Sequence, residues 1–127
     1  GNTSRQLVQM LRDAGAAEVH LRIVSPEVTW PCFYGIDTDS REQLIAANMT
    51  VPEMCEWMGA DSLAFISVEG LHAAVPDCRH DGFCDACFTG DYAVPIPAAM
   101  SKKSFLTKRE LFEESYSMGE QGDLIMP

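Results

Sequence analysis

Residues 3–24 read TSRQLVQMLRDAGAAEVHLRIV, and this stretch contains the first unit of regular structure in the chain. Thr3 and Gln6 have the spacing of a capping box, which predicts that a helix begins there. Apolar residues then recur at helical spacing until Gly15, which is suited to end the helix. From Val19 to Ile23 apolar and polar residues alternate, as in a half-buried strand. A helix, a short turn and a strand in this order form half of a βαβ unit, so the stretch predicts an α/β fold.

Hydroxyl residues that precede helical patterns predict the elements that follow. These are Ser40 with Gln43, Thr50 with Glu53, Ser67, and Thr107 with Glu110. The first pair predicts a helix through Ala47, and the second predicts a helix that ends at Gly59. A short strand is expected over residues 63–68, followed by a helix to about Ala74. The Thr107 pattern predicts a C-terminal helical segment.

Composition limits the classes of protein to consider. The chain has 127 residues, of which 46% are hydrophobic and 22% charged, as expected for one small globular domain. Its net charge of −10 repels phosphate backbones, so we expect no nucleic-acid partner. We find no membrane-length apolar run and no leader, and we expect a cytoplasmic protein. Because a helix pattern begins at once without an initiator Met, we expect that the chain was cut from a larger protein.

The cysteines carry the strongest chemical signal. Cys32 lies in the phrase PCFYGID, residues 31–37, whereas Cys84 and Cys87 lie in FCDACFTG, residues 83–90. A close pair and a distant single cysteine, without an export signal, favour metal or iron–sulfur ligation over disulfides. The competing interpretation is that these cysteines are small buried packing residues. Three thiolates are one fewer than a full set, so a fourth ligand would lie elsewhere in this chain or in absent protein.

Zinc offers an alternative to an iron–sulfur cluster. Cys78, His80, Cys84 and Cys87 could form a local site of the Cys₃His type, although Cys32 would then have no role. Cys55 lies inside a predicted helix, where packing is the simpler interpretation.

The first residues suit a phosphate, although an ordinary helix cap is the simpler interpretation of these four residues alone. Small and hydroxyl-bearing residues at positions 1–4 place free amide groups and a positive dipole end at one point. The residues alone leave both interpretations open.

Several longer phrases resemble, in order, segments of the glutamine phosphoribosylpyrophosphate (PRPP) amidotransferases, also called amidophosphoribosyltransferases. They are residues 1–6, 10–16, 18–20, 31–37, 42–48, 59–63, 67–71 and 84–92. The resemblance covers residues 1–97 and implies part of a type I phosphoribosyltransferase domain, with a parallel sheet, flanking helices and a cluster-ligand segment. Residues 98–127 have no counterpart and are expected to form a variable tail with one helix.

The resemblance implies an activity for the parent protein. Enzymes of this family convert PRPP and glutamine to 5-phosphoribosylamine, pyrophosphate and glutamate, the first step of purine synthesis. Gly1, Asn2 and Thr3 match the end of the PRPP loop, which holds the 5-phosphate; the family usually has Thr where Asn2 stands. The acidic pair that handles ribose and Mg²⁺ would lie upstream of Gly1, as would the glutaminase domain. The fragment alone is therefore expected to be inactive.

The resemblance also makes the metal hypothesis specific. Cys32, Cys84 and Cys87 match three ligands of the [4Fe–4S] cluster found in one branch of the family, the fourth being an upstream cysteine. In that branch the cluster links the C-terminal segment to the subunit and takes no part in the chemistry. PRPP, glutamine and purine nucleotides are the implied ligands of the parent enzyme, and a homotetramer is its implied assembly. A zinc-binding interaction module and a nucleotide-binding regulatory domain remain the alternatives.

Overall fold

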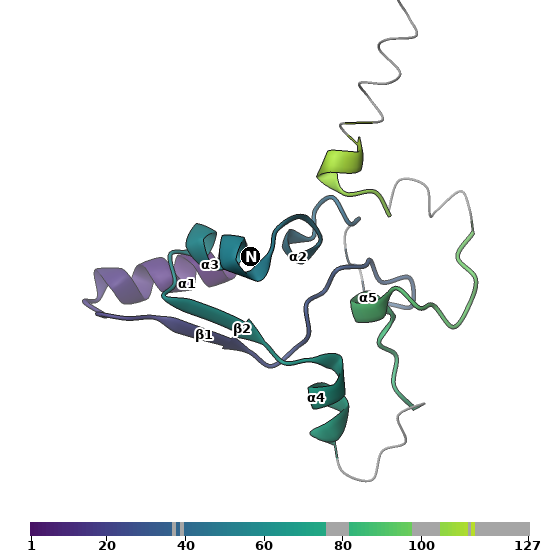
Figure 1. The fold of residues 1–127 in the computed structure, drawn as a ribbon, viewed down its shortest axis with the longest axis horizontal. Helices are drawn as coiled ribbons and strands as arrows, with labels where there is room; N and C mark the ends of the chain where they lie inside the picture. The colour runs from purple at the N-terminus through teal and green to yellow at the C-terminus, as the bar shows by residue number, and fades with distance from the viewer. Residues whose placement is uncertain (37, 39, 76–81, 98–104, 112, 114–127) are drawn as a thin grey trace, which may run out of the picture.

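The computed structural model describes residues 1–36, 38, 40–75, 82–97, 105–111 and 113, as Figure 1 shows. Its elements are α1 (Asn2–Asp13), β1 (His20–Ile23), α2 (Ile45–Asn48), α3 (Val51–Met58), β2 (Ser62–Phe65), α4 (Val68–Ala73) and α5 (Ala86–Thr89).

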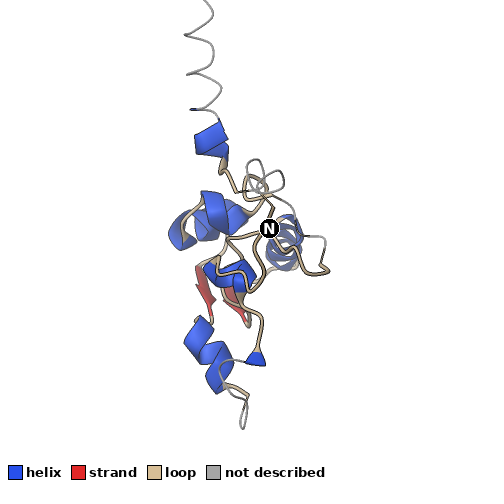
Figure 2. Ribbon diagram, turned by 90° about the vertical axis from the view of Figure 1, so that its right-hand side faces the viewer, coloured by secondary structure: helices blue, strands red, loops and turns tan. Residues whose placement is uncertain are grey.

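Strands β1 and β2 form a two-stranded parallel sheet. His20 lies opposite Ser62, and Ile23 lies opposite Phe65. Helix α3 packs on β2 and on α1, so α1 and α3 cover the same side of the sheet, whereas α4 projects beyond the ends of the strands (Figures 1 and 2). A strand, a helical connection and a parallel strand confirm the predicted α/β class.

The core lies between the helices and one face of the sheet. Val8 of α1, Val19 before β1, and Met54 and Met58 of α3 are buried, and Met54 is 0% exposed. In β1 the exposed residues alternate with half-buried ones, as the sequence predicted. The core is therefore small, and it depends on α3 to join α1 to the sheet.

Local capping chemistry explains where helices α3 and α4 begin. Thr50 and Glu53 form a reciprocal capping box in which Glu53 Oε2 accepts the Thr50 N–H at 2.7 Å. Helix α3 ends at Gly59, whose φ of 74° favours glycine. Ser67 caps α4 by accepting the Gly70 N–H at 3.0 Å. These start and stop predictions are confirmed.

Two predicted helix starts are wrong. Helix α1 begins two residues earlier than a cap at Thr3 indicates, because Gly1 is the cap, the Arg5 N–H bonds to the Gly1 carbonyl and Thr3 lies inside the first turn. The Ser40 pattern does not start a helix either. Residues 41–43 form a turn closed by the Gln43 N–H on the Ser40 carbonyl at 2.9 Å, and α2 begins only at residue 45.

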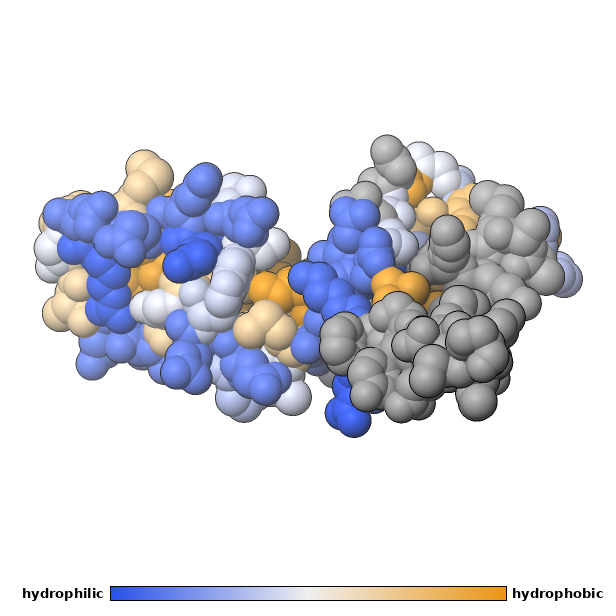
Figure 3. Space-filling view, turned by 90° about the horizontal axis from the view of Figure 1, so that it is seen from above, coloured by the Kyte–Doolittle hydropathy of each residue, from blue (hydrophilic) through white to orange (hydrophobic). Residues whose placement is uncertain are grey.

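Apolar side chains remain on the surface of α1. Leu7, Met10 and Leu11 are 50%, 67% and 41% exposed, while Val8 on the same helix is buried. Figure 3 shows apolar surface interrupting the polar exterior in several places. In the part of the chain that the structure describes, the outer edges of β1 and β2 are also unpaired. These surfaces are those expected of a domain whose sheet is incomplete.

The predicted tail helix is described only at its start. Thr107 and Glu110 form the expected capping contact, with the Thr107 N–H donating to Glu110 Oε2 at 2.7 Å. The rest of residues 98–127 falls largely outside the described residues. Among the helices that are described, none has the length and apolar character needed to cross a bilayer.

Candidate functional site

The two cysteine segments lie side by side although they are far apart in the sequence. The backbone N–H groups of Thr29 and Trp30 donate to the Cys87 carbonyl at 3.1 and 3.0 Å. The Thr29 hydroxyl donates to the Phe88 carbonyl at 3.2 Å. The loop that carries Cys32 is therefore bonded directly to α5, which carries Cys87.

An aromatic cluster holds this arrangement together; its members are Trp30, Phe33, Tyr34, Tyr92 and Phe105. Ring centroids of Phe33 and Tyr92 are 5.4 Å apart, and those of Trp30 and Phe105 are 5.6 Å apart, both in edge-on geometry. The Tyr92 hydroxyl donates to the Pro31 carbonyl at 2.6 Å. Edge-on aromatic pairs add specific stabilisation to simple burial, so the cluster fixes the backbone on both sides of Cys32.

Cys32 lies in a backbone turn that favours its thiolate. The Tyr34 N–H points at Cys32 Sγ at 3.5 Å. Backbone N–H groups, first that of Tyr34 and then those of Ile36 and Gly35, lower the pKa of Cys32 below its ordinary value. N–H groups directed at a sulfur stabilise its negative charge, which is a condition for metal ligation.

The charges of the other cysteines act on Cys87. Burial raises the pKa of Cys87 most, and the charge of Cys32 raises it next, with smaller contributions from Cys84 and Asp85. Burial and then the charges of Cys32 and Cys87 raise the pKa of Tyr92 to about 12. The charge of a Cys32 thiolate therefore opposes ionisation of Cys87. A cationic centre bound beside both sulfurs would oppose that effect.

The described residues do not by themselves form a site for a single metal ion. Within the described ranges no three His, Cys, Asp or Glu side chains are grouped tightly enough to hold one ion. The thiolates of an iron–sulfur cluster bind different iron atoms around an inorganic core, so they need not converge on one point. Of the predicted zinc set, Cys78 and His80 lie outside the described residues. Cys55 lies apart in α3, where its Sγ donates to the Ala60 carbonyl at 3.2 Å.

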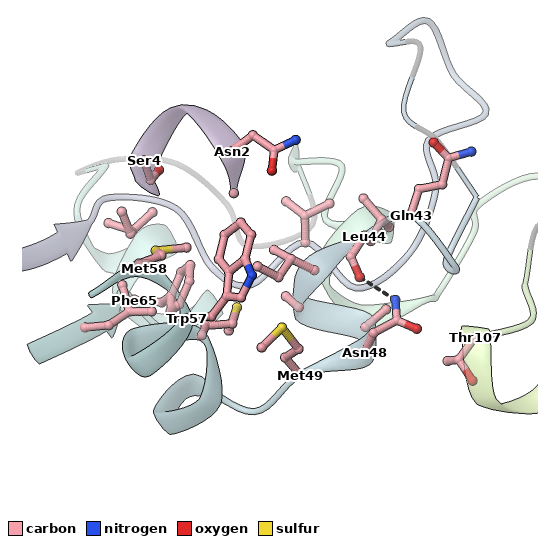
Figure 4. Close-up of a pocket in the computed structure, with 18 of the residues that line it drawn as sticks. Asn2, Ser4, Gln43, Leu44, Asn48, Met49, Trp57, Met58, Phe65 and Thr107 are labelled. Carbon is pink, nitrogen blue, oxygen red and sulfur yellow. Dashed lines mark hydrogen bonds between the residues drawn. The ribbon is translucent and has the colours of Figure 1, made fainter. Parts of the chain in front are cut away.

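A pocket of about 1010 Å³ lies at the carboxyl ends of the two strands. Ile23, Leu63 and Phe65 of the sheet line it together with Met54 and Trp57 of α3. Figure 4 shows that the start of α1 enters from one side, and residues 43–49 and Thr107 lie on the other. The carboxyl edge of a parallel sheet is where α/β proteins usually bind their ligands.

The start of α1 contributes Gly1, Asn2 and Ser4 to this pocket, while Thr3 is not among its lining residues. Of the three residues matched to the phosphate loop, Gly1 and Asn2 therefore line the pocket and Thr3 does not. Ser4, the last of the residues at positions 1–4 that the sequence indicated as suited to a phosphate, lines the pocket as well. A Cβ atom on Gly1 would lie 2.9 Å from Ile45 Cδ1, so glycine allows this close approach.

The amino end of α1 gives the pocket a positive pole. Among the described residues, no side chain caps this end, so its first N–H groups remain available. The dipole of a 12-residue helix adds partial positive charge at the same place. Arg5 stacks 4.9 Å from the centroid of Trp57 and adds a full positive charge nearby. The arrangement can therefore bind an anionic group next to an apolar floor.

Comparison with known proteins gives a consistent result, although no family model matches the chain. The chain is 52% identical over 107 residues to the amidophosphoribosyltransferase of Synechocystis sp., covering 84% of this chain and 21% of that protein. It is 53% identical over 98 residues to that of Archaeoglobus fulgidus and 52% identical over 99 residues to that of Bacillus subtilis, in each case covering 76% of this chain and 21% of the relative. The chain thus spans about one fifth of the length of the curated relatives it matches.

Solved structures agree with the sequence relatives. Glutamine PRPP amidotransferase from B. subtilis, complexed with ADP and GMP, matches with a TM-score of 0.69 and 50% identity, over 76% of this chain and 22% of that one. A structure described as the allosteric regulatory enzyme of purine biosynthesis matches with a TM-score of 0.67 and 46% identity, over 85% of this chain and 23% of that one.

Proposed function

Because the chain belongs to the amidophosphoribosyltransferase family, we propose that it forms the C-terminal part of an enzyme that converts PRPP and glutamine to 5-phosphoribosylamine, pyrophosphate and glutamate. The observation that carries this proposal is 52% identity over 107 residues. A match of 107 residues in a 127-residue chain necessarily includes most of the parallel sheet and both cysteine segments. A freestanding zinc module finds no support in these relatives.

The start of α1 is proposed to hold the 5-phosphate of PRPP. Gly1 and Asn2 line the pocket, Thr3 follows them, and the uncapped N–H groups of the helix suit a dianionic phosphate. The Asn2 side chain can donate a hydrogen bond as the family's usual Thr can. Mg²⁺ is expected to accompany PRPP, with its ligands in residues that this chain does not include.

Cys32, Cys84 and Cys87 are proposed to be three of the four ligands of a [4Fe–4S] cluster. The support is the bonding between their segments and the lowered pKa of Cys32. When bound, the cluster would supply a structural cross-link and no step of the reaction. These residues would hold the C-terminal segment against the loop at residues 29–34.

Further properties of the parent enzyme follow from the same proposal. Purine nucleotides are expected ligands, since the B. subtilis neighbour was solved with ADP and GMP. A homotetramer in the cytoplasm is the expected assembly, and no nucleic-acid partner is expected.

The activity is tested on the intact protein, meaning the product of the whole reading frame that encodes this chain. We expect glutamine-dependent release of pyrophosphate from PRPP by the intact protein, and none by the 127-residue chain alone. Absence of PRPP turnover in the intact, cofactor-loaded protein would contradict the proposal.

The phosphate site is tested by Asn2→Ala in the same assay. Losing a hydrogen bond to a charged group costs about 1.5–3 kcal/mol, so we expect the KM for PRPP to rise roughly 10-fold or more. Gln6→Ala is the matched control, because Gln6 lies on α1 but does not line the pocket. Equal KM values for the two variants would place the phosphate elsewhere.

The ligand set is tested by alkylation followed by mass spectrometry. In anaerobically purified intact protein we expect Cys32, Cys84 and Cys87 to resist iodoacetamide and to react once the cluster is destroyed by oxidation. Cys55 serves as the internal control, because its reactivity should not depend on the cluster. Reaction of Cys84, which is exposed, before cluster loss would argue against ligation.

A further inference from the structure

One segment touches both the cysteine site and the pocket. Residues 105–109, named here the strap, begin with Phe105, whose ring lies 5.6 Å from Trp30, 5.8 Å from Phe33 and 5.9 Å from Tyr92. Thr107, with the two residues after it, lines the pocket (Figure 4). The strap therefore runs from the aromatic cluster beside Cys32 to the wall of the pocket.

The side chain of Asn48 joins the strap to the opposite segment of that wall. Its Nδ2 donates to the carbonyls of Arg41 at 2.7 Å and Leu44 at 2.6 Å, and its Oδ1 accepts the Lys108 N–H at 2.9 Å. One amide thus shapes the turn at residues 41–44 and holds the strap against it. Since Leu44 and Asn48 themselves line the pocket, the strap and the 42–48 segment form one wall.

Arg41 connects the same wall to the cysteine loop. Its guanidinium lies 4.1 Å from the centroid of Trp30. Its Nε donates to the Thr29 carbonyl at 3.0 Å, and its Nη1 donates to the Phe105 carbonyl at 3.3 Å. The peptide unit between Thr29 and Trp30 therefore contacts both sites: its N–H bonds to the Cys87 carbonyl and its carbonyl accepts from Arg41.

We propose that the strap is a conformational coupling element through which the order of the cysteine site holds the pocket wall closed. With the cysteine segments in place, the aromatic cluster fixes Phe105, Arg41 fixes the turn, and Asn48 locks the two together. When the cysteine site is disrupted, Phe105 loses its ring contacts and the wall formed by residues 42–48 and 107–109 loosens. The proposal rests on the proposed function only in naming the cluster as what orders the cysteines.

The coupling is tested by residue-resolved amide hydrogen exchange on the intact protein. Phe105→Ala removes the anchor in the aromatic cluster, and we expect exchange in both 41–48 and 105–111 to become roughly 10-fold faster or more. Phe83→Ala is the matched control, because Phe83 is an exposed ring that stacks on His72 outside the cluster. Unchanged exchange in β1 and β2 shows that each variant has folded.

A milder variant and a cysteine variant complete the test. Phe105→Leu keeps most of the apolar volume and should give an intermediate increase in 41–48. Cys32→Ala should raise exchange in the same two segments. Faster exchange confined to 105–111 in the Phe105 variants, or unchanged exchange in 41–48 with Cys32→Ala, overturns the proposal. Iron and sulfide content is measured separately. Their absence would refute the proposed cofactor, while the effect of Phe105→Ala on 41–48 would still decide the strap.

Discussion

Gly90→Ala probes the contact that holds the two cysteine segments together. Gly90 ends α5 with a φ of 84°, and an added Cβ would lie 2.6 Å from Cε2 of Trp30 and 2.9 Å from its Nε1. The left-handed backbone costs a non-glycine residue about 1–2 kcal/mol. The steric overlap with the indole ring costs about 1–3 kcal/mol more, as overpacking does elsewhere. Movement of Trp30 away from α5 relieves the steric cost, whereas the backbone cost stays at residue 90.

The expected result is local opening at the bonds between Trp30, Thr29 and Cys87. The steric cost of about 1–3 kcal/mol corresponds to about 5- to 160-fold faster amide exchange at Thr29 and Trp30. Gly59→Ala is the matched control, since Gly59 has a φ of 74° but no atom within 4 Å of an added Cβ. Gly59→Ala should lower stability only at the end of α3, through the backbone cost, and the exchange rates of the Thr29 and Trp30 amides should stay unchanged. Equal exchange of the two amides in both variants, measured by mass spectrometry on the intact protein, would refute the steric argument.

Two further changes test the packing and the electrostatics of the fold. Met54→Ala empties a fully buried position between α1 and the sheet, so we expect a loss of about 2–5 kcal/mol, seen as a lower thermal midpoint of the intact protein. Asp61 accepts the Val19 N–H at 2.7 Å, and this bond, more than the neighbouring guanidinium, lowers the pKa of Asp61 below its ordinary value of 3.8. The stability that Asp61 contributes is therefore present above its ordinary pKa and is lost as the pH falls through its lowered pKa in the folded protein. Asp61→Asn should therefore make the free energy of urea unfolding less dependent on pH in the acid range. An unchanged pH profile would contradict this assignment.

Local chemistry explains why much of the fold could be predicted from the sequence. The capping box at Thr50, the cap at Ser67 and the alternation over β1 each depend on residues within a few positions, so their patterns were sufficient. The pattern at Ser40 looks the same in sequence but does not begin a helix. There the side chain of Asn48 bonds to the carbonyls of Arg41 and Leu44, and this contact selects a turn over a helix.

The candidate sites were only partly predictable, because they depend on contacts between residues that are far apart in the sequence. The close pair Cys84 and Cys87 with the distant Cys32 indicated a metal site, and the resemblance made the hypothesis a [4Fe–4S] cluster. Neither could show the backbone bonds that bring the segments together. The wall of the pocket depends on a hydrogen bond between Lys108 and Asn48, which are 60 residues apart. A side chain that acts over that distance leaves no periodic signal.

Iron and acid-labile sulfide, measured on anaerobically purified intact protein, test the central claim most directly. A cluster held by Cys32, Cys84, Cys87 and one more thiolate should give about four iron and four sulfide per chain, as its formula requires. Cys32→Ala should lose most of both, whereas Cys55→Ala should retain them. Zinc without sulfide, or a full complement of iron in Cys32→Ala, would contradict the assignment of these cysteines.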